Sequence, residues 1–174
     1  MYDLASYESP LGMLTLAGSG DCLVGLWFQR QSHYLASLAP QDCRSCESPV
    51  LTRAMQWLDA YFSGRQPTIL SLPLYPEGTP FRRLVWHILC QIPYGQVRTY
   101  GSIAEEVASR QGKDHMSAQA IGGAVGHNPI SIIIPCHRVV GAGGNLTGYA
   151  GGIDKKRQLL QHEGVDLSGL KSRD

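Results

Sequence analysis

The chain has 174 residues, enough for one large domain or two small ones, and its 43% hydrophobic and 17% charged residues are typical of a globular protein and exclude a disordered one. No apolar run approaches the roughly eighteen residues that span a bilayer. Because the N-terminus also carries Asp3 and Glu8 where a secretion signal would be basic, we expect a cytoplasmic protein with no membrane partner.

The formal net charge is +1, but the two halves of the chain differ in sign. Residues 1–80 carry 4 Lys and Arg against 7 Asp and Glu, a net charge of −3, whereas residues 81–174 carry 11 against 7, a net charge of +4. We would place a polyanion on the basic half. An ordinary solvated surface is the alternative explanation of so small an excess.

Three short strands are predicted at the start of the chain: residues 2–7, 13–17 and 22–28. The turn signals at residues 9–12 and 18–21 separate them, which favours an antiparallel arrangement. Residues 38–48, with their proline, aspartate and serines, are interpreted as a loop.

Ser48 and Pro49 predict the start of a helix, with Ser48 as the N-cap and Pro49 at the first helical position, and Gly64 predicts its end. Apolar residues at helical spacing predict the face that packs on the sheet: Leu51, Met55, Leu58 and Phe62. No motif of visible chemistry lies in this half, and we interpret it as a scaffold.

The five cysteines are odd in number and scattered, so we expect reduced thiols and no disulfide framework. Cys43 and Cys46 form a CxxC pair, which could supply half of a tetrahedral zinc site. The further ligands would be Cys22 and His33, at spacings that fit no zinc-finger pattern. We therefore expect a polar loop with two incidental thiols, and no metal or cofactor.

The proline-rich segment 66–79 is unsuited to a central strand and predicts a domain boundary. We expect an N-terminal α/β scaffold domain at residues 1–76 and a second domain at residues 77–166. Residues 167–174 would form a loosely ordered tail.

The second half begins with two predicted helices. Thr79 and Pro80 open the first, which runs to about Ile92, and Thr99 caps the second, which ends near Arg110. The residues expected to face inward are Phe81, Leu84, Val85, Ile88 and Leu89 in the first helix and Ile103, Val107 and Ala108 in the second.

A turn at residues 111–114 leads to a third helix, capped by Ser117, and two short helices joined in this way indicate a helix-turn-helix. The third helix consists mainly of small residues: Ala118, Ala120, Gly122, Gly123 and Ala124. Only Gln119 could read base edges in a major groove. The small residues would instead let the helix approach another surface closely, either a nucleic acid or a neighbouring helix.

Residues 128–140 combine a thiol, an imidazole and an apolar run. The β-branched run closed by Pro135 predicts a buried strand, with Cys136 held just past its end. A reactive thiolate needs a base, and His137 is adjacent. Since successive side chains of an extended segment point to opposite faces, we expect a bridging water between them. Alternatively, Cys136 is simply a small buried hydrophobe.

The segments 141–145 and 146–152 are rich in glycine, so their backbone could approach a flat ligand closely. With Tyr149 beside it, such a backbone suits a nucleobase pocket, although an ordinary loop has the same composition. A last helix is predicted from Asp154 to His162, with Leu159 and Leu160 inward.

The chain resembles the O6-alkylguanine-DNA alkyltransferases, also called methylated-DNA–protein-cysteine methyltransferases. The residues that carry the resemblance are Pro135-Cys136-His137-Arg138-Val139, Asn128-Pro129, Gly148-Tyr149, His162-Glu163-Gly164 and, weakly, Ser9-Pro10-Leu11-Gly12. The resemblance covers the C-terminal half continuously. It implies a ribonuclease-H-like α/β N-terminal domain, a small antiparallel sheet plus a helix, and a mainly α, helix-turn-helix (winged-helix-like) C-terminal domain.

The activity that the resemblance implies is direct and irreversible transfer of an alkyl group from O6-alkylguanine, and in some members O4-methylthymine, to Cys136. The protein would be spent after one turnover, and the nucleotide would be flipped out of the duplex. His137 would take the thiol proton through water, and Glu163 would hold and polarise the imidazole. Asn128 would brace the turn, and Tyr100 would donate a proton to the departing base.

The same resemblance implies how the base and the DNA are held. The base would be read by the carbonyls of Cys136 and Val139 and the amide of Ala150, with Tyr149 and Val125 at the pocket. The residues implied for DNA contact are Ser117, Ala118, Gln119, Ala120, Arg82 and Lys156. We expect a monomer, without cofactor, that binds double-stranded DNA containing O6-alkylguanine from the minor groove.

Gln119 departs from the family pattern, which has an arginine at this position to fill the gap left by the flipped base. A glutamine can hydrogen-bond an orphaned cytosine but brings no charge and less stacking surface. We therefore expect Gln119 to affect DNA affinity and flipping, and to leave the thiol chemistry unchanged.

Two other classes of protein are weighed against this interpretation. A non-enzymatic lesion-binding protein of the alkyltransferase-like kind lacks the cysteine, and Cys136 argues against it. A thiol hydrolase or redox protein would need an oxyanion site or a resolving cysteine, and neither is close to Cys136 in the sequence.

Overall fold

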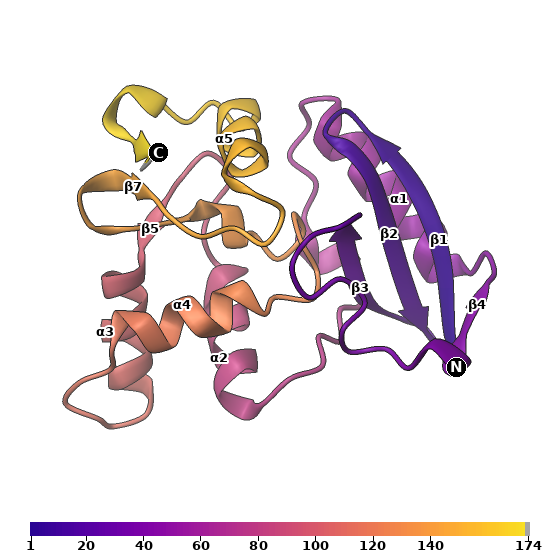
Figure 1. Cartoon of the computed structure of the whole chain (residues 1–174), viewed down its shortest axis with the longest axis horizontal. Coiled ribbons are helices and arrows are strands. Elements are labelled where there is room, and N and C mark those ends of the chain that lie inside the picture. Colours follow the sequence, from indigo (N-terminus) through magenta and orange to yellow (C-terminus); the bar gives the residue numbers. More distant parts are fainter. Residues whose placement is uncertain (173–174) are drawn as a thin grey trace. The chain divides into compact units, whose positions relative to one another are not determined.

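The computed structural model describes residues 1–172, and these divide into two compact units (Figure 1). The first unit is Met1–Glu77 together with Pro129–Ile133, and the second comprises Gly78–Asn128 and the chain from Ile134 onward. The five-residue segment 129–133 therefore interrupts the second unit in sequence. Among the described residues, no helix is both long enough and apolar enough to cross a membrane.

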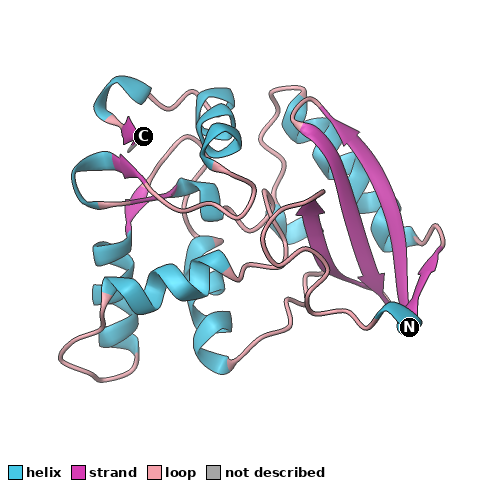
Figure 2. Cartoon of the chain, viewed as in Figure 1, coloured by secondary structure: helices cyan, strands magenta, loops and turns pink. Residues whose placement is uncertain are grey.

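The first unit contains a sheet of strand order β3-β2-β1-β4, in which β1, β2 and β3 are antiparallel neighbours and β4 runs parallel to β1 (Figure 2). The strands are β1 (Tyr2–Ser9), β2 (Gly12–Ser19), β3 (Cys22–Phe28) and β4 (Cys43–Ser45). The first three confirm the predicted strands. The prediction of a loop across residues 38–48 is wrong at β4, because this short segment pairs with the exposed edge of β1.

Helix α1 (Pro49–Phe62) begins where Ser48 and Pro49 predicted, although the Ser48 hydroxyl accepts no capping hydrogen bond from a backbone N–H of the first turn. Its buried residues are Val50, Leu51, Ala54, Trp57, Leu58 and Tyr61. The predicted inner face is wrong at Met55 and Phe62, which are only partly buried. The apolar stripe is rotated toward Trp57 and Tyr61, whose rings stack 5.5 Å apart and bury more area than Met55 could.

The second unit contains the helices α2 (Pro80–Leu89), α3 (Tyr100–Arg110), α4 (Ala118–Gly126) and α5 (Ile153–His162). The side chains of Thr79, Thr99 and Ser117 each accept a hydrogen bond from a backbone N–H in the first turn of α2, α3 and α4, which confirms the three predicted N-caps. α2 ends at Leu89, earlier than predicted, since the residues before Pro93 are disfavoured in a helix.

The remaining regular elements of the described residues are short strands and 3-10 turns. The parallel pairs are β5 (Arg98–Thr99) with β6 (Val139–Val140) and β7 (Asn145–Leu146) with β8 (Lys171–Ser172). The 3-10 turns of the chain are Pro40–Asp42, Ile69–Ser71, Cys136–Arg138, Ala142–Gly144 and Leu167–Gly169. The expectation of a loosely ordered tail is wrong for residues 167–172, because β8 pairs with β7; residues 173–174 lie outside the described chain.

The buried faces of these helices agree only partly with the sequence pattern. Ile103, Val107 and Ala108 in α3 and Leu159 and Leu160 in α5 are buried as predicted. In α2 the buried residues are Val85, Trp86, Ile88 and Leu89. Phe81 and Leu84, predicted to face inward, are only partly buried, because the larger ring of Trp86 takes the inner position.

The apolar run before Cys136 is buried, but the prediction of a strand is wrong. Ile130 forms an isolated bridge with Leu26, and the chain then turns tightly. The N–H of Ile133 donates to the Ser131 carbonyl at 2.8 Å, around Ile132 with φ of +69°. A turn of this kind is rare and strained, and for a β-branched residue it costs about 1–3 kcal/mol. Surrounding hydrogen bonds must therefore hold it.

A second tight turn, at Pro135, directly precedes Cys136. The N–H of Cys136 donates to the Ile134 carbonyl at 2.8 Å, around Pro135 with φ of −82° and ψ of 64°. These angles are those of an inverse γ-turn, which the proline ring favours because it fixes φ near this value. Cys136 therefore begins a 3-10 turn, and does not follow a strand.

Trp86 links helix α2 to helix α4. Its indole N–H donates to the Ala124 carbonyl at 2.8 Å, and the ring is 1% exposed. Ala124 lies in the last turn of α4, and its carbonyl also accepts a hydrogen bond from the His127 N–H at 3.3 Å, so the indole N–H is the closer of two donors. The hydrogen bond therefore fixes the end of α4 that leads into Asn128.

We predict that the loss of the Trp86 hydrogen bond in Trp86→Phe lowers the free energy of unfolding by about 0.5–1.5 kcal/mol beyond the effect of the smaller ring, because the Ala124 carbonyl keeps only its longer hydrogen bond from the His127 N–H. Urea denaturation measures the change. Trp27→Phe is the matched control for loss of ring volume, since Trp27 is equally buried in the first unit. Equal losses in both variants would mean that the hydrogen bond to Ala124 contributes nothing.

Candidate active site

The thiol of Cys136 lies against the side chain of Asn128. Cys136 is 4% exposed, and its Sγ accepts a hydrogen bond from Asn128 Nδ2 at 3.1 Å. The same Nδ2 donates to the Ile134 carbonyl at 2.9 Å. Asn128 therefore bonds both to Ile134, where the chain re-enters the second unit, and to the thiol of Cys136.

The ionisation of this thiol is set by opposing effects. Burial raises the pKa of Cys136, whereas the hydrogen bond from Asn128 and the positive charge of Lys156 act in the lowering direction. Burial dominates, so the thiol is protonated at neutral pH. A nearby base is then needed if the sulfur is to react as a thiolate.

His137, adjacent to Cys136 in the chain, is the candidate for that base. Its Nε2 lies 3.0 Å from Glu163 Oε1, and both side chains are buried. Burial lowers the pKa of His137, in spite of Glu163, so the ring is neutral. Because a carboxylate only accepts hydrogen bonds, Nε2 carries the proton and Nδ1 is the basic nitrogen. Within residues 1–172, Nδ1 has no hydrogen-bond partner.

Glu163 is held as an anion by Arg138. Arg138 donates from Nε to Oε2 at 2.9 Å and from Nη2 to Oε1 at 2.6 Å, and from Nη1 to the Ile92 carbonyl at 2.6 Å. Burial would raise the pKa of Glu163, but the hydrogen bonds from His137 and Arg138 outweigh it and lower the pKa to about 2. The guanidinium also lies 5.7 Å from the centre of the Tyr94 ring.

The expectation that Lys156 contacts DNA is wrong. Its side chain is 0% exposed, and Nζ donates to the carbonyls of Val139, Thr147 and Gly148. Three acceptors match the three protons of an ammonium group. Burial lowers its pKa to about 8, while Cys136 acts in the opposite direction. Lys156 therefore belongs to the thiol site, and its charge is unavailable to a phosphate.

Tyr100 and the two carbonyls implied for base recognition all have partners. Tyr100 Oη donates to the Thr147 carbonyl at 3.1 Å, and burial, reinforced by Cys136, raises its pKa to about 12, so the hydroxyl keeps its proton. The Val139 N–H donates to the Cys136 carbonyl, and the Val139 carbonyl accepts from Lys156. A carbonyl has two lone pairs, so each can still accept a further hydrogen bond.

The structure brings Asn128, Cys136, His137 and Glu163 together as the sequence suggested. The remaining predicted residues are placed as follows: Val125 is buried on α4, Tyr149, Ala150, Ala120 and Arg82 are partly exposed, and Ser117, Ala118 and Gln119 are exposed. The N-terminal turn of α4 is therefore accessible to a large ligand. Sequence reasoning missed Arg138, although it lies inside the quoted motif, and misassigned Lys156.

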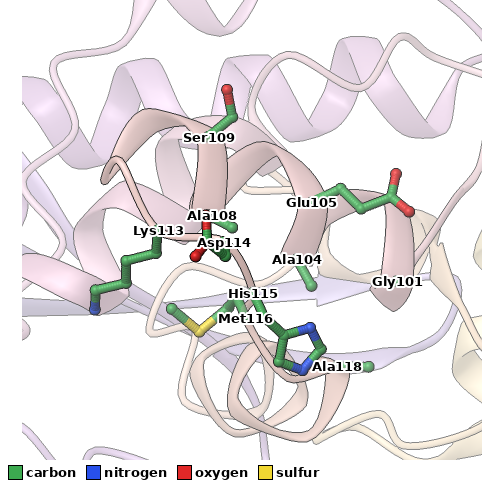
Figure 3. A pocket seen from close by; sticks show the side chains of 10 residues that line it. All are labelled: Gly101, Ala104, Glu105, Ala108, Ser109, Lys113, Asp114, His115, Met116 and Ala118. Atoms are coloured by element: carbon green, nitrogen blue, oxygen red, sulfur yellow. The ribbon is translucent and has the colours of Figure 1, made fainter.

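A separate hollow of about 570 Å³ opens beside α3 and the loop before α4 (Figure 3). Its charged and polar lining is Glu105, Ser109, Lys113, Asp114 and His115. No side chain of the thiol site lines it. Among residues 1–172, no three His, Cys, Asp or Glu side chains gather in a way that could hold a metal ion. Cys43 and Cys46 each donate to a backbone carbonyl instead.

The depressed pKa of Glu163 predicts how stability depends on pH. Its folded value of about 2 lies below the ordinary value of about 4.3, so its stabilisation is complete above about pH 5 and is lost as the pH falls through 2. The loss should be on the order of 3 kcal/mol. Urea denaturation between about pH 7 and pH 2 measures it.

Glu163→Gln should be less stable at pH 7 by about 3–5 kcal/mol, because Arg138 is left buried without its partner, but its stability should fall less below pH 5. Glu105→Gln, which alters an exposed carboxyl of α3, should keep the wild-type dependence. Identical acid slopes for Glu163→Gln and the wild type would contradict the assignment of this acid-sensitive stabilisation to Glu163.

Comparison with known families gives two matches that together cover most of the chain. Residues 4–76 match the model described as 6-O-methylguanine DNA methyltransferase, ribonuclease-like domain. Residues 80–165 match 6-O-methylguanine DNA methyltransferase, DNA binding domain. The two-domain architecture, a sheet-containing N-terminal domain followed by a helical C-terminal domain, is that of this family.

Similar proteins match this chain over most of their length. The methylated-DNA–protein-cysteine methyltransferase of Mycobacterium bovis is 42% identical over 164 residues, covering 94% of this chain and 93% of the relative. That of Haemophilus influenzae is 37% identical, covering 91% and 84%. The structure of Mycobacterium tuberculosis OGT in complex with DNA is 41% identical, covers 92% of each chain and has a TM-score of 0.79. This chain therefore belongs to the methylated-DNA–protein-cysteine methyltransferase family.

Proposed function

We propose that this chain repairs O6-alkylguanine in double-stranded DNA by transferring the alkyl group to Cys136 in one irreversible turnover. The observation that carries the proposal is a buried thiol, held by Asn128, that directly precedes a neutral His137 paired with Glu163. The family of the chain supplies the substrate. A thioether is the product, so the protein is a suicide enzyme in which each molecule acts once.

The chemistry is a displacement at an sp3 carbon. A bond forms between Cys136 Sγ and the alkyl carbon, the bond from that carbon to guanine O6 breaks, and its electron pair stays with the base. The thiol proton passes through a water molecule to His137 Nδ1, and Glu163 stabilises the imidazolium that forms. Tyr100 donates a proton to the departing guanine, and the proton taken up by His137 returns through water to the Tyr100 oxygen, so that in total one proton moves from the thiol to the base.

The base pocket is assigned to backbone groups that Lys156 organises. The carbonyls of Cys136 and Val139 and the amide of Ala150 read the base edge, and Tyr149 and Val125 line the pocket. Because Lys156 donates hydrogen bonds to the carbonyls of residues 139, 147 and 148, it fixes the position of this backbone. The same pocket accepts O4-methylthymine as a second substrate in this proposal.

DNA is proposed to bind through α3 and α4 as a helix-turn-helix of winged-helix type, with α4 in the minor groove. Small residues along α4 let its backbone approach the sugars and phosphates, and Ser117, Ala118 and Ala120 contact them. Gln119 fills the gap left by the flipped nucleotide, and Arg82, at the start of α2, adds a phosphate contact.

Each of the two predicted domains has its own role in this proposal. Residues 1–76 form the ribonuclease-H-like scaffold, residues 77–166 bind DNA and carry out the transfer, and residues 167–174 form the C-terminal tail. The protein acts as a monomer on DNA, without a cofactor. Because the reaction needs both a reduced thiol and genomic DNA, we place it in the cytoplasm.

Cys136 alone among the five cysteines should acquire the alkyl group, one equivalent per protein, because it is the one that is buried and the one that a histidine follows. Mass spectrometry with peptide mapping after reaction with O6-methylguanine DNA measures this. Cys136→Ala should abolish transfer and keep lesion binding, while Cys90→Ala should react as the wild type does. Label on Cys43 or Cys46, or more than one equivalent, would refute the assignment.

Gln119→Arg should raise affinity for DNA and steepen its salt dependence by about one counterion, because an added guanidinium brings a charge near the phosphates. The rate with free O6-benzylguanine, which requires no flipping, should stay nearly unchanged. Gln119→Lys is the matched control, since it adds the charge without the planar stacking surface. Equal effects on free base and duplex would place residue 119 at the pocket, and no effect on either would exclude α4 as the recognition helix.

A further inference from the structure

The five residues before the thiol's turn pack within the first unit. Segment 129–133 lies along the end of β3, where the Leu26 N–H donates to the Pro129 carbonyl at 2.9 Å and the Ser131 N–H donates to the Leu26 carbonyl at 2.8 Å. All of segment 129–133 is buried. Segment 129–133, which precedes Cys136 by two residues, therefore belongs to a different unit from the thiol, His137 and Glu163.

Gln31 makes the side-chain part of this anchor. Its amide is buried, with the residue only 7% exposed. Gln31 Oε1 accepts hydrogen bonds from the Phe28 N–H at 2.7 Å and from Ser131 Oγ at 3.2 Å. Nε2 donates to the Ser32 carbonyl at 3.4 Å. One buried amide thus ties the end of β3 to Ser131.

Ser131 begins the strained turn. Its carbonyl accepts from the Ile133 N–H at 2.8 Å, and this bond closes the turn around Ile132 with its positive φ. The next residue, Ile134, offers its carbonyl to both Asn128 Nδ2 and the Cys136 N–H. Strained backbone persists only where its surroundings hold it. The orientation of the Ile134 carbonyl, and with it the Asn128 amide, therefore depends on how firmly Ser131 is held.

We propose that Gln31 is a positioning residue for alkyl transfer: through Ser131 it holds the turn at Ile132 and so keeps Asn128 Nδ2 directed at Cys136 Sγ. The inference rests on the proposed role of Cys136 as the acceptor. It assigns to the N-terminal unit, which carries no reacting group, a direct part in setting the reactivity of the thiol.

The consequence for the chemistry is electrostatic. The hydrogen bond from Asn128 is the largest of the effects that favour the thiolate form of Cys136. When the turn relaxes, this bond lengthens and the pKa of the thiol rises. The other groups that act on the sulfur are the backbone N–H groups of Cys136 and His137, Tyr100 of α3 and Lys156 of α5, and the hydrogen bonds of Gln31 go to none of them.

The test is the pH dependence of the rate with free O6-benzylguanine, measured on the full-length protein. Gln31→Met keeps the size of the side chain and removes its hydrogen bonds to Ser131 and Phe28. We expect a rate about 5–10-fold lower at pH 7, with the profile displaced to higher pH by about one unit, so that the two proteins converge in alkaline solution.

Thr15→Val is the matched control. It removes another hydrogen bond of the first unit, the partly buried one between Thr15 Oγ1 and Tyr34 Oη at 2.9 Å, which is remote in sequence from segment 129–133. Thr15→Val should lower stability and leave the pH profile unchanged. If Thr15→Val displaces the profile as far as Gln31→Met does, or if Gln31→Met does not displace it, the inference is wrong.

A double-mutant cycle with Ser131→Ala locates the effect. If Gln31 acts through Ser131, the double variant should react no more slowly than the slower single variant. Multiplicative slowing would overturn the proposed route. Labelling of Cys136 in the wild type, followed by mass spectrometry, separates this question from the proposed function: without that label the function fails, whereas with it, equal rates for wild type and Gln31→Met reject only the role of Gln31.

Discussion

The amide of Asn128 is the contact on which the site depends, because a single Nδ2 group meets both the Ile134 carbonyl and the Cys136 sulfur. A segment of five residues leaves the second unit after Asn128 and returns at Ile134. Without the hydrogen bond between Asn128 and Ile134, the position of the thiol would change with every movement of segment 129–133. A buried hydrogen bond to the chain's own backbone removes that freedom and also directs a donor at the sulfur.

The same site buries several ionisable groups, and each is matched by a partner. Arg138 and Glu163 meet in a paired geometry, His137 donates to Glu163, and Lys156 donates to three carbonyls. Unpaired charges in this environment would be strongly destabilising. The pairing has a chemical effect as well, because an anion fixed by Arg138 keeps the proton of His137 on Nε2 and leaves Nδ1 basic. Arg138 therefore acts on the tautomer of His137 through Glu163, whose Oε1 accepts a hydrogen bond from each of the two side chains.

The helix starts and the first three strands could be predicted because their signals are local: Thr79, Thr99 and Ser117 each cap the helix that follows. The run before Cys136 could not, since a short apolar segment has the same pattern whether it is a buried strand or a buried pair of turns. Nothing in the sequence marks Ile132, a β-branched residue, for a positive φ. The DNA contact that the resemblance implied for Lys156 is wrong because the fold brings three carbonyls to its ammonium group, and no sequence pattern marks a lysine for such burial.

Burial of the thiol has a further meaning for a protein that would react only once. Because burial raises the pKa of Cys136, the resting sulfur is a thiol, and a thiol is a far weaker nucleophile and metal ligand than a thiolate. In the proposed reaction the thiolate forms only when the proton can pass to His137, beside a bound base. Desolvation thus protects the acceptor before the substrate arrives, whereas Asn128 and Lys156 keep the cost of ionisation low enough for it to occur. The protein needs both effects, since a fully activated thiolate would be consumed by other electrophiles, and a thiol without these partners would not react.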